Sequence, residues 1–262
     1  MKLVVKVGTS SLAFPDGKMN YPQIEAMCRV LAALKSSGHQ VVLVSSGAIG
    51  MGVGKLALKK RPEDIPSKQA AAAVGQVELM YTYDRIFAGS GVTVAQILLT
   101  GTDIHSPQRL TNFQNTMGRL LELGVLPIIN ENDTVATDEI VIGDNDTLAA
   151  IVAVNIQADM LVLLSDIDGL YSGDPHSCPE ARLIERVDEI GAELMGMAGG
   201  SAGGLGTGGM LTKLSAAQMC TAAGVDMIIS NGMKPELLYR LEGGLPFGTR
   251  FVSHNIKEED AP

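Results

Sequence analysis

Short apolar runs recur along the chain and alternate with longer segments of helical periodicity. Within each run the apolar character is continuous rather than alternating, which is typical of strands in a parallel sheet that helices cover on both faces. We therefore predict strands at residues 3–7, 41–44, 92–99, 125–129, 160–164 and 225–229.

Helices are predicted between these strands at residues 21–35, 67–87, 147–154 and 211–223. Asn20 and Ser67 have the polar side chains that cap the first turn of a helix, so we expect them to begin the first two. The repeated strand–helix–strand order predicts one α/β domain, a three-layer αβα sandwich with a mainly parallel central sheet.

Loops rich in Gly, Ser, Asn and Asp follow several of the predicted strands. They are residues 8–11, 45–54 and 130–146, with a fourth polar loop at 199–209. In doubly wound sheets ligands collect at the carboxyl ends of the strands, so we expect function in these loops. Residues 134–143 alternate enough to predict a β-hairpin that could act as a lid.

The composition narrows the class of protein. Hydrophobic residues make up 46% of the chain, charged residues 19%, and the net charge of −9 disfavours nucleic acid as a partner. Cys28, Cys178 and Cys220 have no metal-ligand spacing and are expected to be buried free thiols. No apolar tract approaches the roughly 18 residues of a membrane span, and no leader is evident, so we expect a cytoplasmic protein without a membrane partner.

A glycine-rich run at residues 203–210 precedes the helix predicted at 211–223. The amides at such a helix start attract phosphate, and Lys213 would add a positive charge there. A flexible linker is the alternative interpretation, and Lys213 favours phosphate. The run contains dinucleotide-fold spacing without a preceding strand, and the P-loop-like segment at 50–55 lacks the required hydroxyl residue, so we discount both motifs.

Lys6 lies near the end of the first predicted strand, where a charged side chain is costly unless it reaches a cleft or a partner. An edge-strand lysine that deters aggregation is the alternative. Because Gly8 and a hydroxyl-rich turn follow, we favour anion binding by Lys6.

Carboxylates and amides are concentrated on both sides of the predicted hairpin, at residues 130–133 and 143–146. This density favours recognition of a polar ligand, although turn chemistry and a helix N-cap would explain any single member. Ser165 and Asp166 follow another buried strand and offer a hydroxyl and a carboxylate beside the expected nucleotide region. The four histidines show no spacing of a catalytic triad or a metal site.

With these residues in view, the sequence resembles the amino acid kinases, most closely the members that phosphorylate L-glutamate. The matching motifs extend over nearly the whole chain. They are Val4-Val5-Lys6-Val7-Gly8-Thr9-Ser10, Ser45-Ser46-Gly47-Ala48-Ile49, Ser67-Lys68-Gln69, Asn130-Glu131-Asn132-Asp133, Gly143-Asp144-Asn145-Asp146, and Gly206-Thr207-Gly208-Gly209-Met210 with Lys213.

The resemblance implies transfer of the γ-phosphoryl group of ATP, with Mg²⁺ present, to the side-chain carboxylate of L-glutamate, as the first step of proline biosynthesis. It implies catalytic roles for Lys6, Gly8, Asp146 and Lys213, with Asp146 holding the lysines. It implies that Ser46, Asp133 and Asn145 bind glutamate. The implied ATP-binding residues are Lys6, Ser165, Asp166, Thr207, Gly208, Gly209, Met210, Leu211, Thr212 and Lys213, and no residue is assigned directly to the metal.

The resemblance also implies features of assembly and regulation. The part before about residue 160 would bind the amino acid and residues 160–262 would bind ATP. Proline would be a feedback inhibitor, the chain would form a homo-oligomer, and glutamyl phosphate reductase would be a functional partner. Many members continue into a C-terminal module that resembles RNA-modifying enzymes, and we expect this chain to be the kinase domain without it.

Other activities remain as alternatives. Kinases of acetylglutamate, uridylate or isopentenyl phosphate would share the ATP half, but the residues after the first two strands, Gly8-Thr9-Ser10 and Ser45-Ser46-Gly47, favour glutamate. A non-catalytic amino-acid sensor and a dinucleotide-binding protein are alternatives of another class. Intact Lys6, Asp146 and Lys213 favour the kinase over the sensor.

Overall fold

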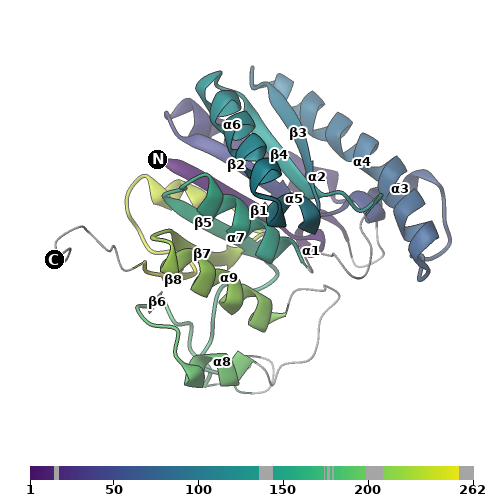
Figure 1. Ribbon diagram of the computed structural model, residues 1–262. Coiled ribbons are helices and arrows are strands. Elements are labelled where there is room, and N and C mark those ends of the chain that lie inside the picture. Colours follow the sequence, from purple (N-terminus) through teal and green to yellow (C-terminus); the bar gives the residue numbers. More distant parts are fainter. Residues whose placement is uncertain are drawn as a thin grey trace.

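The computed structural model describes residues 1–14, 18–135, 144–173, 175, 178, 180–198 and 209–253. These residues form an eight-stranded sheet in the order β3-β4-β2-β1-β5-β7-β8-β6, with helices on both faces (Figure 1). The strands are β1 (Lys2–Val7), β2 (Gln40–Ser45), β3 (Val94–Leu99), β4 (Leu126–Glu131), β5 (Met160–Ser165), β6 (Arg186–Val187), β7 (Asp226–Asn231) and β8 (Thr249–Phe251). The predicted αβα sandwich with a mainly parallel sheet is confirmed.

The helices are α1 (Thr9–Leu12), α2 (Tyr21–Ser36), α3 (Ala48–Lys55), α4 (Ile65–Ala88), α5 (Gly101–His105), α6 (Pro107–Glu122), α7 (Asn145–Asn155), α8 (Ala192–Ala198) and α9 (Met210–Ala222), with a 3₁₀ helix η1 (Pro235–Leu241). In Figure 1, α6, α7 and α9 lie across one face of the sheet, while α2 and α4 lie across the other. α8 lies near β6, and its residues Leu194 and Met195 pack against the core cluster to which α9 contributes.

The side chains of the central strands alternate between the two helix layers. In β1, Leu3 and Val5 pack with α2 and α4, whereas Val4 packs with α6, α7 and α9. Side chains on a strand alternate with a period of two, so Lys6 faces the same layer as Val4. By the same alternation Ser45, at the end of β2, faces the layer that contains α4.

The strand order places a topological switch beside β1. β2, β4 and β3 lie on one side of β1, and β5 and β7 lie on the other, all parallel to their neighbours in this part of the sheet. Loops that leave the carboxyl ends of β1, β2 and β5 therefore diverge, and in sheets of this kind ligands bind where such loops separate. At the edge, two short strands that were not predicted extend the sheet: β8 pairs antiparallel with β7, and β6 pairs parallel with β8.

The predicted loop at residues 45–54 is wrong over most of its length, because Ala48–Lys55 forms α3. α3 packs so closely on α4 that a Cβ atom at Gly52 would lie 1.8 Å from the carbonyl oxygen of Ala71. A Cβ atom at Gly75 would lie 1.8 Å from the carbonyl oxygen of Ala48. The glycine spacing that looked like a P-loop thus includes a residue that the helix crossing requires.

Gly52→Ala is expected to lower the free energy of unfolding by about 2–3 kcal/mol, because the added methyl group must displace backbone in a packed helix crossing. The melting temperature should fall by roughly 5–10 °C. Gly54→Ala is the matched control, since a Cβ atom at Gly54 in the same helix would have no neighbour within 4 Å. Equal melting temperatures for the two variants would contradict the close crossing.

Side-chain caps begin several of the helices, including α2, α4 and α7. Asn20 accepts a hydrogen bond from the first turn of α2, as predicted. The predicted start at Ser67 is wrong: Asp64 is the N-cap of α4 and accepts from the Ser67 amide. Asp144 is the N-cap of α7, which confirms the N-cap interpretation of this residue.

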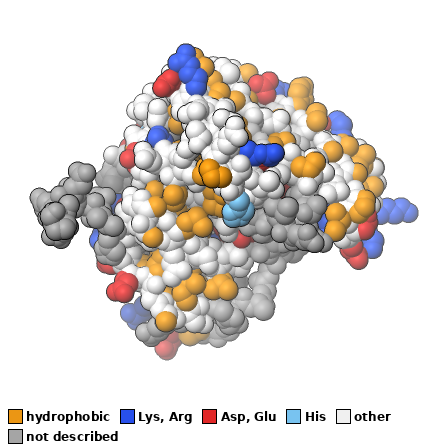
Figure 2. Space-filling view, viewed as in Figure 1, with side chains coloured by type: hydrophobic (Ala, Val, Ile, Leu, Met, Phe, Trp, Pro, Cys, Tyr) orange, Lys and Arg blue, Asp and Glu red, His pale blue; other side chains and the backbone are white. Residues whose placement is uncertain are grey.

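On the face shown in Figure 2, the Lys and Arg side chains of described residues are scattered and do not form a continuous patch. Within the described ranges, no helix has the length and apolarity needed to cross a bilayer. Cys28 and Cys220 are buried free thiols, but the prediction is wrong for Cys178, which lies exposed in a loop outside the core.

Candidate active site

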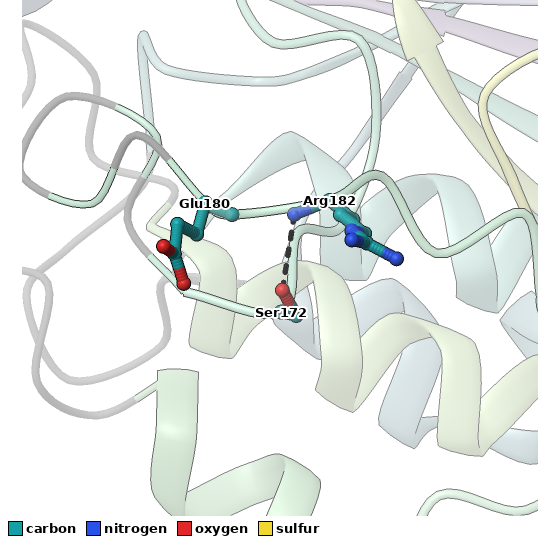
Figure 3. A pocket seen from close by; sticks show the side chains of 4 residues that line it. Ser172, Glu180 and Arg182 are labelled. Carbon is teal, nitrogen blue, oxygen red and sulfur yellow. Dashed lines mark hydrogen bonds between the residues drawn. The ribbon is translucent and has the colours of Figure 1, made fainter.

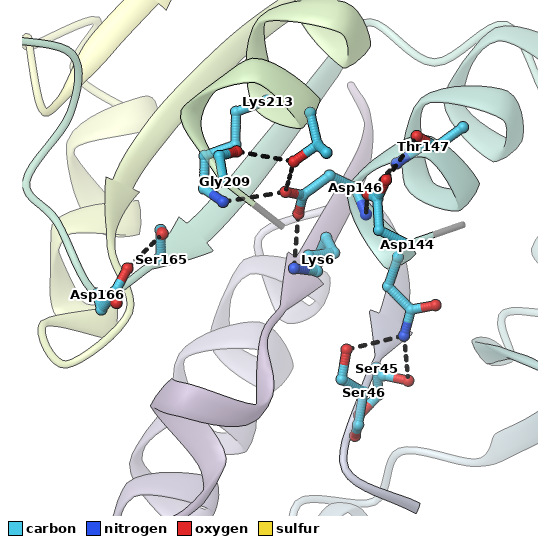
Figure 4. Close-up of polar contacts among 12 residues, drawn as sticks. Lys6, Ser45, Ser46, Asp144, Asp146, Thr147, Ser165, Asp166, Gly209 and Lys213 are labelled. Carbon is cyan, nitrogen blue, oxygen red and sulfur yellow. Dashed lines mark hydrogen bonds and ion pairs between the residues drawn. The ribbon is translucent and has the colours of Figure 1, made fainter. Parts of the chain in front are cut away.

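Two lysines and one aspartate meet at the carboxyl end of β1. Lys6 Nζ lies 2.6 Å from Asp146 Oδ1, and Lys213 Nζ lies 3.0 Å from Asp146 Oδ2 (Figure 4). Their exposed fractions are 9% for Lys6, 1% for Asp146 and 6% for Lys213. The structure thus brings together three predicted site residues that lie far apart in the sequence. We call them the lysine–aspartate cluster.

Three elements supply the lysine–aspartate cluster. Lys6 comes from β1, Asp146 from the first turn of α7, and Lys213 from the first turn of α9. α7 and α9 both cover the face toward which Lys6 points, so the alternation of β1 brings the lysine to them. Thr212 adds a contact, because its Oγ1 lies 3.3 Å from Asp146 Oδ2 and 2.8 Å from the Gly209 carbonyl.

Opposing effects act on the pKa of Asp146. Burial alone would raise this pKa, but the charges and hydrogen bonds of Lys6 and Lys213 hold it below its ordinary value. With all three groups ionised, the cluster carries one net positive charge in a buried position. A cluster with this excess positive charge is suited to binding an anion. When no anion is bound, Asp146 keeps the two ammonium groups apart and oriented.

Gly8 lies directly beside the lysine–aspartate cluster. A Cβ atom at Gly8 would come within 3.4 Å of Lys6 Nζ, so the absence of a side chain keeps the space next to the ammonium group open. Gly8 is also the N-cap residue of the short helix α1. This position agrees with close approach of a ligand to the backbone, and its implied catalytic role stays a prediction.

A second polar group lies where β2 and β4 end. The side-chain amide of Asn145 lies 2.8 Å from Ser46 Oγ, 3.1 Å from Asn130 Oδ1 and 3.3 Å from the carbonyl oxygen of Ser45. Gln76 of α4 accepts from Asn130 Nδ2 at 3.1 Å. We call Gln76, Asn130, Asn145 and Ser46 the amide network. Because Asn145 and Asp146 are consecutive, this network adjoins the lysine–aspartate cluster.

Asp133 lies beyond the end of β4, at a hollow of about 240 Å³. The hollow is lined by Ala48, Ala72, Ala73, Gln76, Val77, Gln96, Leu98, Glu131, Asn132, Asp133 and Thr134. Burial, and to a smaller extent the charge of Glu131, raise the pKa of Asp133 to about 6, while the charge of Arg61 opposes them. The amide network reaches this hollow through Gln76.

The residues implied in ATP binding fall into two groups. Ser165 ends β5, and its Oγ donates to Asp166 Oδ1 at 3.0 Å, on the side of the lysine–aspartate cluster away from Ser46 (Figure 4). Gly209 is the N-cap of α9, and Met210, Leu211 and Thr212 form its first turn with Lys213. Thr207 and Gly208 lie outside the described residues. Residues 136–143 of the predicted hairpin lie outside them as well.

Sequence reasoning missed a third polar group, at the ends of β5 and β7. Asp168 Oδ1 accepts from Asn231 Nδ2 at 2.9 Å and from Lys234 Nζ at 3.2 Å. These bonds lower the pKa of Asp168, with the Asn231 bond the largest cause. The polar segment that follows the strand predicted at 225–229 is the same kind of signal that identified the other loops, and it would have identified this one.

A larger and more open hollow lies away from these groups. It is about 620 Å³ and is lined by Ser172, Glu180, Ala181 and Arg182 (Figure 3). The Arg182 amide donates to Ser172 Oγ at 3.0 Å. Among its described lining residues there is no counterpart of the buried charges at the carboxyl ends of the strands, so the lysine–aspartate cluster is the candidate active site.

A buried, positively charged cluster at the switch point of a parallel sheet defines a phosphotransferase, because phosphoryl transfer needs positioning and charge neutralisation above all. The model of the amino acid kinase family matches residues 1–231. The chain belongs to this family.

Known relatives agree with this assignment. The chain is 50% identical to the glutamate 5-kinase of Clostridium acetobutylicum, over 97% of this chain and 95% of that protein. It is 49% identical to the glutamate 5-kinase of Thermoanaerobacter sp. strain X514, over 96% of this chain and 68% of that protein. Among solved structures, carbamate kinase from Giardia lamblia bound to AMP-PNP superposes with a TM-score of 0.69 and 16% identity, covering 97% of this chain and 98% of that one, which shows the fold.

Proposed function

We propose that this chain transfers the γ-phosphoryl group of ATP to the side-chain carboxylate of L-glutamate. The products are glutamyl 5-phosphate and ADP, and the reaction is the first step of proline biosynthesis. The observation that carries the proposal is the lysine–aspartate cluster, joined through Asn145 and Asp146 to a polar group suited to an amino acid. The glutamate 5-kinases to which the chain is similar support the choice of substrate.

The reaction needs no general base. The side chain of glutamate is ionised at neutral pH, so its oxygen can attack the γ-phosphorus directly while the bond to the β,γ-bridging oxygen breaks. Asp146, the buried carboxylate nearest the reaction, is held by two lysines and positions them rather than accepting a proton. Lys6 and Lys213 neutralise charge on the moving phosphoryl group, and Gly8 offers its amide to the same group.

Ser46 and Asn145 are proposed to hold glutamate, with Asp133 facing its ammonium group. Asn145 donates to Ser46 Oγ, so the two side chains form one preorganised surface beside Asp146. Asp133 lies at the hollow that the amide network reaches, and a carboxylate there attracts a cation. In this arrangement the side-chain carboxylate of glutamate points toward Lys6 and Lys213, and its ammonium group points away from them.

The nucleotide is proposed to bind on the opposite side, between Ser165, Asp166 and the first turn of α9. Thr207 and Gly208, outside the described residues, are proposed as further nucleotide-binding residues. Within the described ranges, no group of three or more His, Cys, Asp and Glu is arranged to hold a metal ion. Mg²⁺ is proposed to be bound mainly by the phosphates of ATP, as is usual for nucleotide sites. When bound, Mg²⁺ would neutralise charge on the phosphates.

The test is hydroxamate formation with Mg-ATP and hydroxylamine, comparing glutamate, aspartate and acetylglutamate. Hydroxylamine captures an acyl phosphate, so glutamate should give hydroxamate and release ADP in equal amounts. Aspartate has a shorter side chain, and acetylglutamate lacks the ammonium group that Asp133 is proposed to bind. Preferential reaction of acetylglutamate would reject the proposed substrate, and binding of glutamate without any turnover would support the sensor instead.

Lower pH is expected to weaken glutamate binding through Asp133. Because the pKa of this carboxyl is raised to about 6, it is ionised at pH 7.5 and becomes protonated as the pH falls through 6. If the ionised form binds the ammonium group, KM for glutamate should rise about tenfold between pH 7.5 and pH 5. Asp133→Asn should have a high KM at both pH values, and an unchanged pH profile in this variant would remove Asp133 from the role.

Proline as a feedback ligand, self-assembly, a functional link to glutamyl phosphate reductase and a cytoplasmic location belong to the same proposal. Proline has an ammonium and a carboxylate like glutamate, so it should compete at Ser46 and Asp133. The acyl phosphate product is reactive, which suits prompt consumption by a reductase. Inhibition by proline that glutamate cannot relieve would place proline elsewhere.

A further inference from the structure

Helix α4 contributes two buried polar side chains to the end of the sheet where the amino acid is proposed to bind. Its buried face is otherwise made of small or apolar residues and Thr82, and it contains Gln76, 8% exposed, and Tyr83, fully buried. The two residues are seven positions apart, which on a helix is almost two turns, so they share one face. Burying two polar groups is costly unless each has a partner.

Each of these side chains has a partner at the end of a different strand. The Tyr83 hydroxyl lies 2.7 Å from Ser45 Oγ, and Ser45 is the fully buried last residue of β2. Gln76 Oε1 accepts from Asn130 Nδ2 at 3.1 Å near the end of β4. α4 is therefore hydrogen-bonded to the ends of β2 and β4, the two strands next to which the amide network lies.

The bond from Gln76 fixes the orientation of the Asn130 amide. Since Asn130 donates through Nδ2 to Gln76, its oxygen Oδ1 points the other way, where it accepts from Asn145 at 3.1 Å and from the Glu131 amide at 2.9 Å. If Asn130 turned over, its NH₂ group would face the NH₂ group of Asn145. Gln76 thus keeps Asn130 as an acceptor for a residue proposed to bind glutamate.

The bond from Tyr83 acts on the neighbouring turn. Ser45 Oγ also donates to the Ser46 carbonyl at 2.9 Å, and the Ser45 carbonyl lies 3.3 Å from Asn145 Nδ2. The hydroxyl of Tyr83 therefore fixes the side chain of Ser45, and Ser45 in turn holds the backbone of Ser46. Asn145 contacts both ends of this arrangement, Ser46 on one side and Asn130 on the other.

We infer that Gln76 and Tyr83 are positioning residues for the amino-acid substrate, acting from α4 through Asn130 and Ser45 on Asn145 and Ser46. This inference rests on the proposed function of that site. The lysine–aspartate cluster and the first turn of α9 have no hydrogen bond to either residue among the described contacts. The two residues should therefore affect the acceptor and leave the nucleotide unaffected.

The test uses Tyr83→Phe and Gln76→Met, which keep the size of each side chain and remove its polar end. Each should raise KM for glutamate by roughly 5-fold, the effect of losing one hydrogen bond, with KM for ATP within twofold of wild type. Thr82→Val is the matched control, because Thr82 is buried on the same helix but its hydroxyl bonds to the Glu78 carbonyl of that helix. It should leave both KM values unchanged.

A double variant separates positioning from general loosening. If Tyr83 acts through Ser45, then Ser45→Ala with Tyr83→Phe should be no worse for glutamate KM than Ser45→Ala alone. Additive effects, equal changes in both KM values, or a lower melting temperature with unchanged KM would overturn the inference. Turnover by the wild type tests the proposed function first. The variants are then compared with the amino acid that the wild type phosphorylates. The proposed function and the positioning role of Gln76 and Tyr83 can therefore fail separately.

Discussion

Lys213→Ala is expected to lower kcat by roughly 10²-fold or more. Lys213 Nζ lies 3.0 Å from Asp146 and is one of the two buried ammonium groups at the site where the phosphoryl group is proposed to move. Loss of one preorganised donor to a transition-state oxyanion costs ~3–4 kcal/mol. Because this stabilisation arises in the transition state, KM for glutamate should change much less than kcat, and steady-state kinetics with both substrates measure the difference.

Lys55→Ala is the control for this variant. Lys55 also forms an ion pair, with Glu78 at 2.8 Å, but its side chain is 59% exposed and lies on the surface of α3. It should leave kcat within a factor of two. Lys213→Met adds a second comparison, since it keeps most of the packing of the lysine stem and removes the charge. Turnover near the wild-type value in Lys213→Met would remove Lys213 from catalysis.

Asp146→Asn is expected to lower both activity and stability. It removes the carboxylate that separates Lys6 and Lys213, and leaves two buried ammonium groups facing an uncharged amide. Loss of one member of a buried ionic group costs about 3–5 kcal/mol of folding free energy. A fall in melting temperature of roughly 10 °C and a loss of kcat of at least about 10²-fold should accompany each other.

The difference in stability between wild type and Asp146→Asn should depend on pH. Because the pKa of Asp146 is depressed in the folded protein, its contribution is present above the pKa of an aspartate in the unfolded chain. It is lost as the pH falls through the folded pKa. Wild type should therefore exceed Asp146→Asn in stability at pH 7 and lose this advantage in acid. A constant difference at all pH values would show that packing, and not charge, causes the effect.

The sequence was most informative where its signals were local and repeated. Continuous apolar runs predicted six parallel strands because burial on both faces leaves a strong pattern. α3 was missed, since its glycines signal a loop when read alone, and only its partner explains Gly52, whose missing side chain admits the backbone of α4. β6 and β8 were missed because strands of two and three residues carry too little pattern.

The site was predicted less evenly than the fold. Lys6 and Lys213 could be recognised because a lysine at a strand end and a lysine at a glycine-rich helix start are each unusual. Gln76 and Tyr83 gave no such signal, because a buried polar residue in an alanine-rich helix looks like any helical residue until its partners are known. Their contacts join residues far apart in the chain, and spacing along the sequence does not encode such contacts.

The central place of β1 has a consequence for how the protein is made. β1 is among the first elements to leave the ribosome, and β2 can pair with one of its edges early. Its other edge pairs with β5, which is synthesised after five further helices (α3 to α7) and two further strands (β3 and β4). During this interval the nascent chain exposes an apolar strand edge and an ammonium group without its carboxylate, so we expect chaperone dependence to be greatest before α7 and β5 emerge.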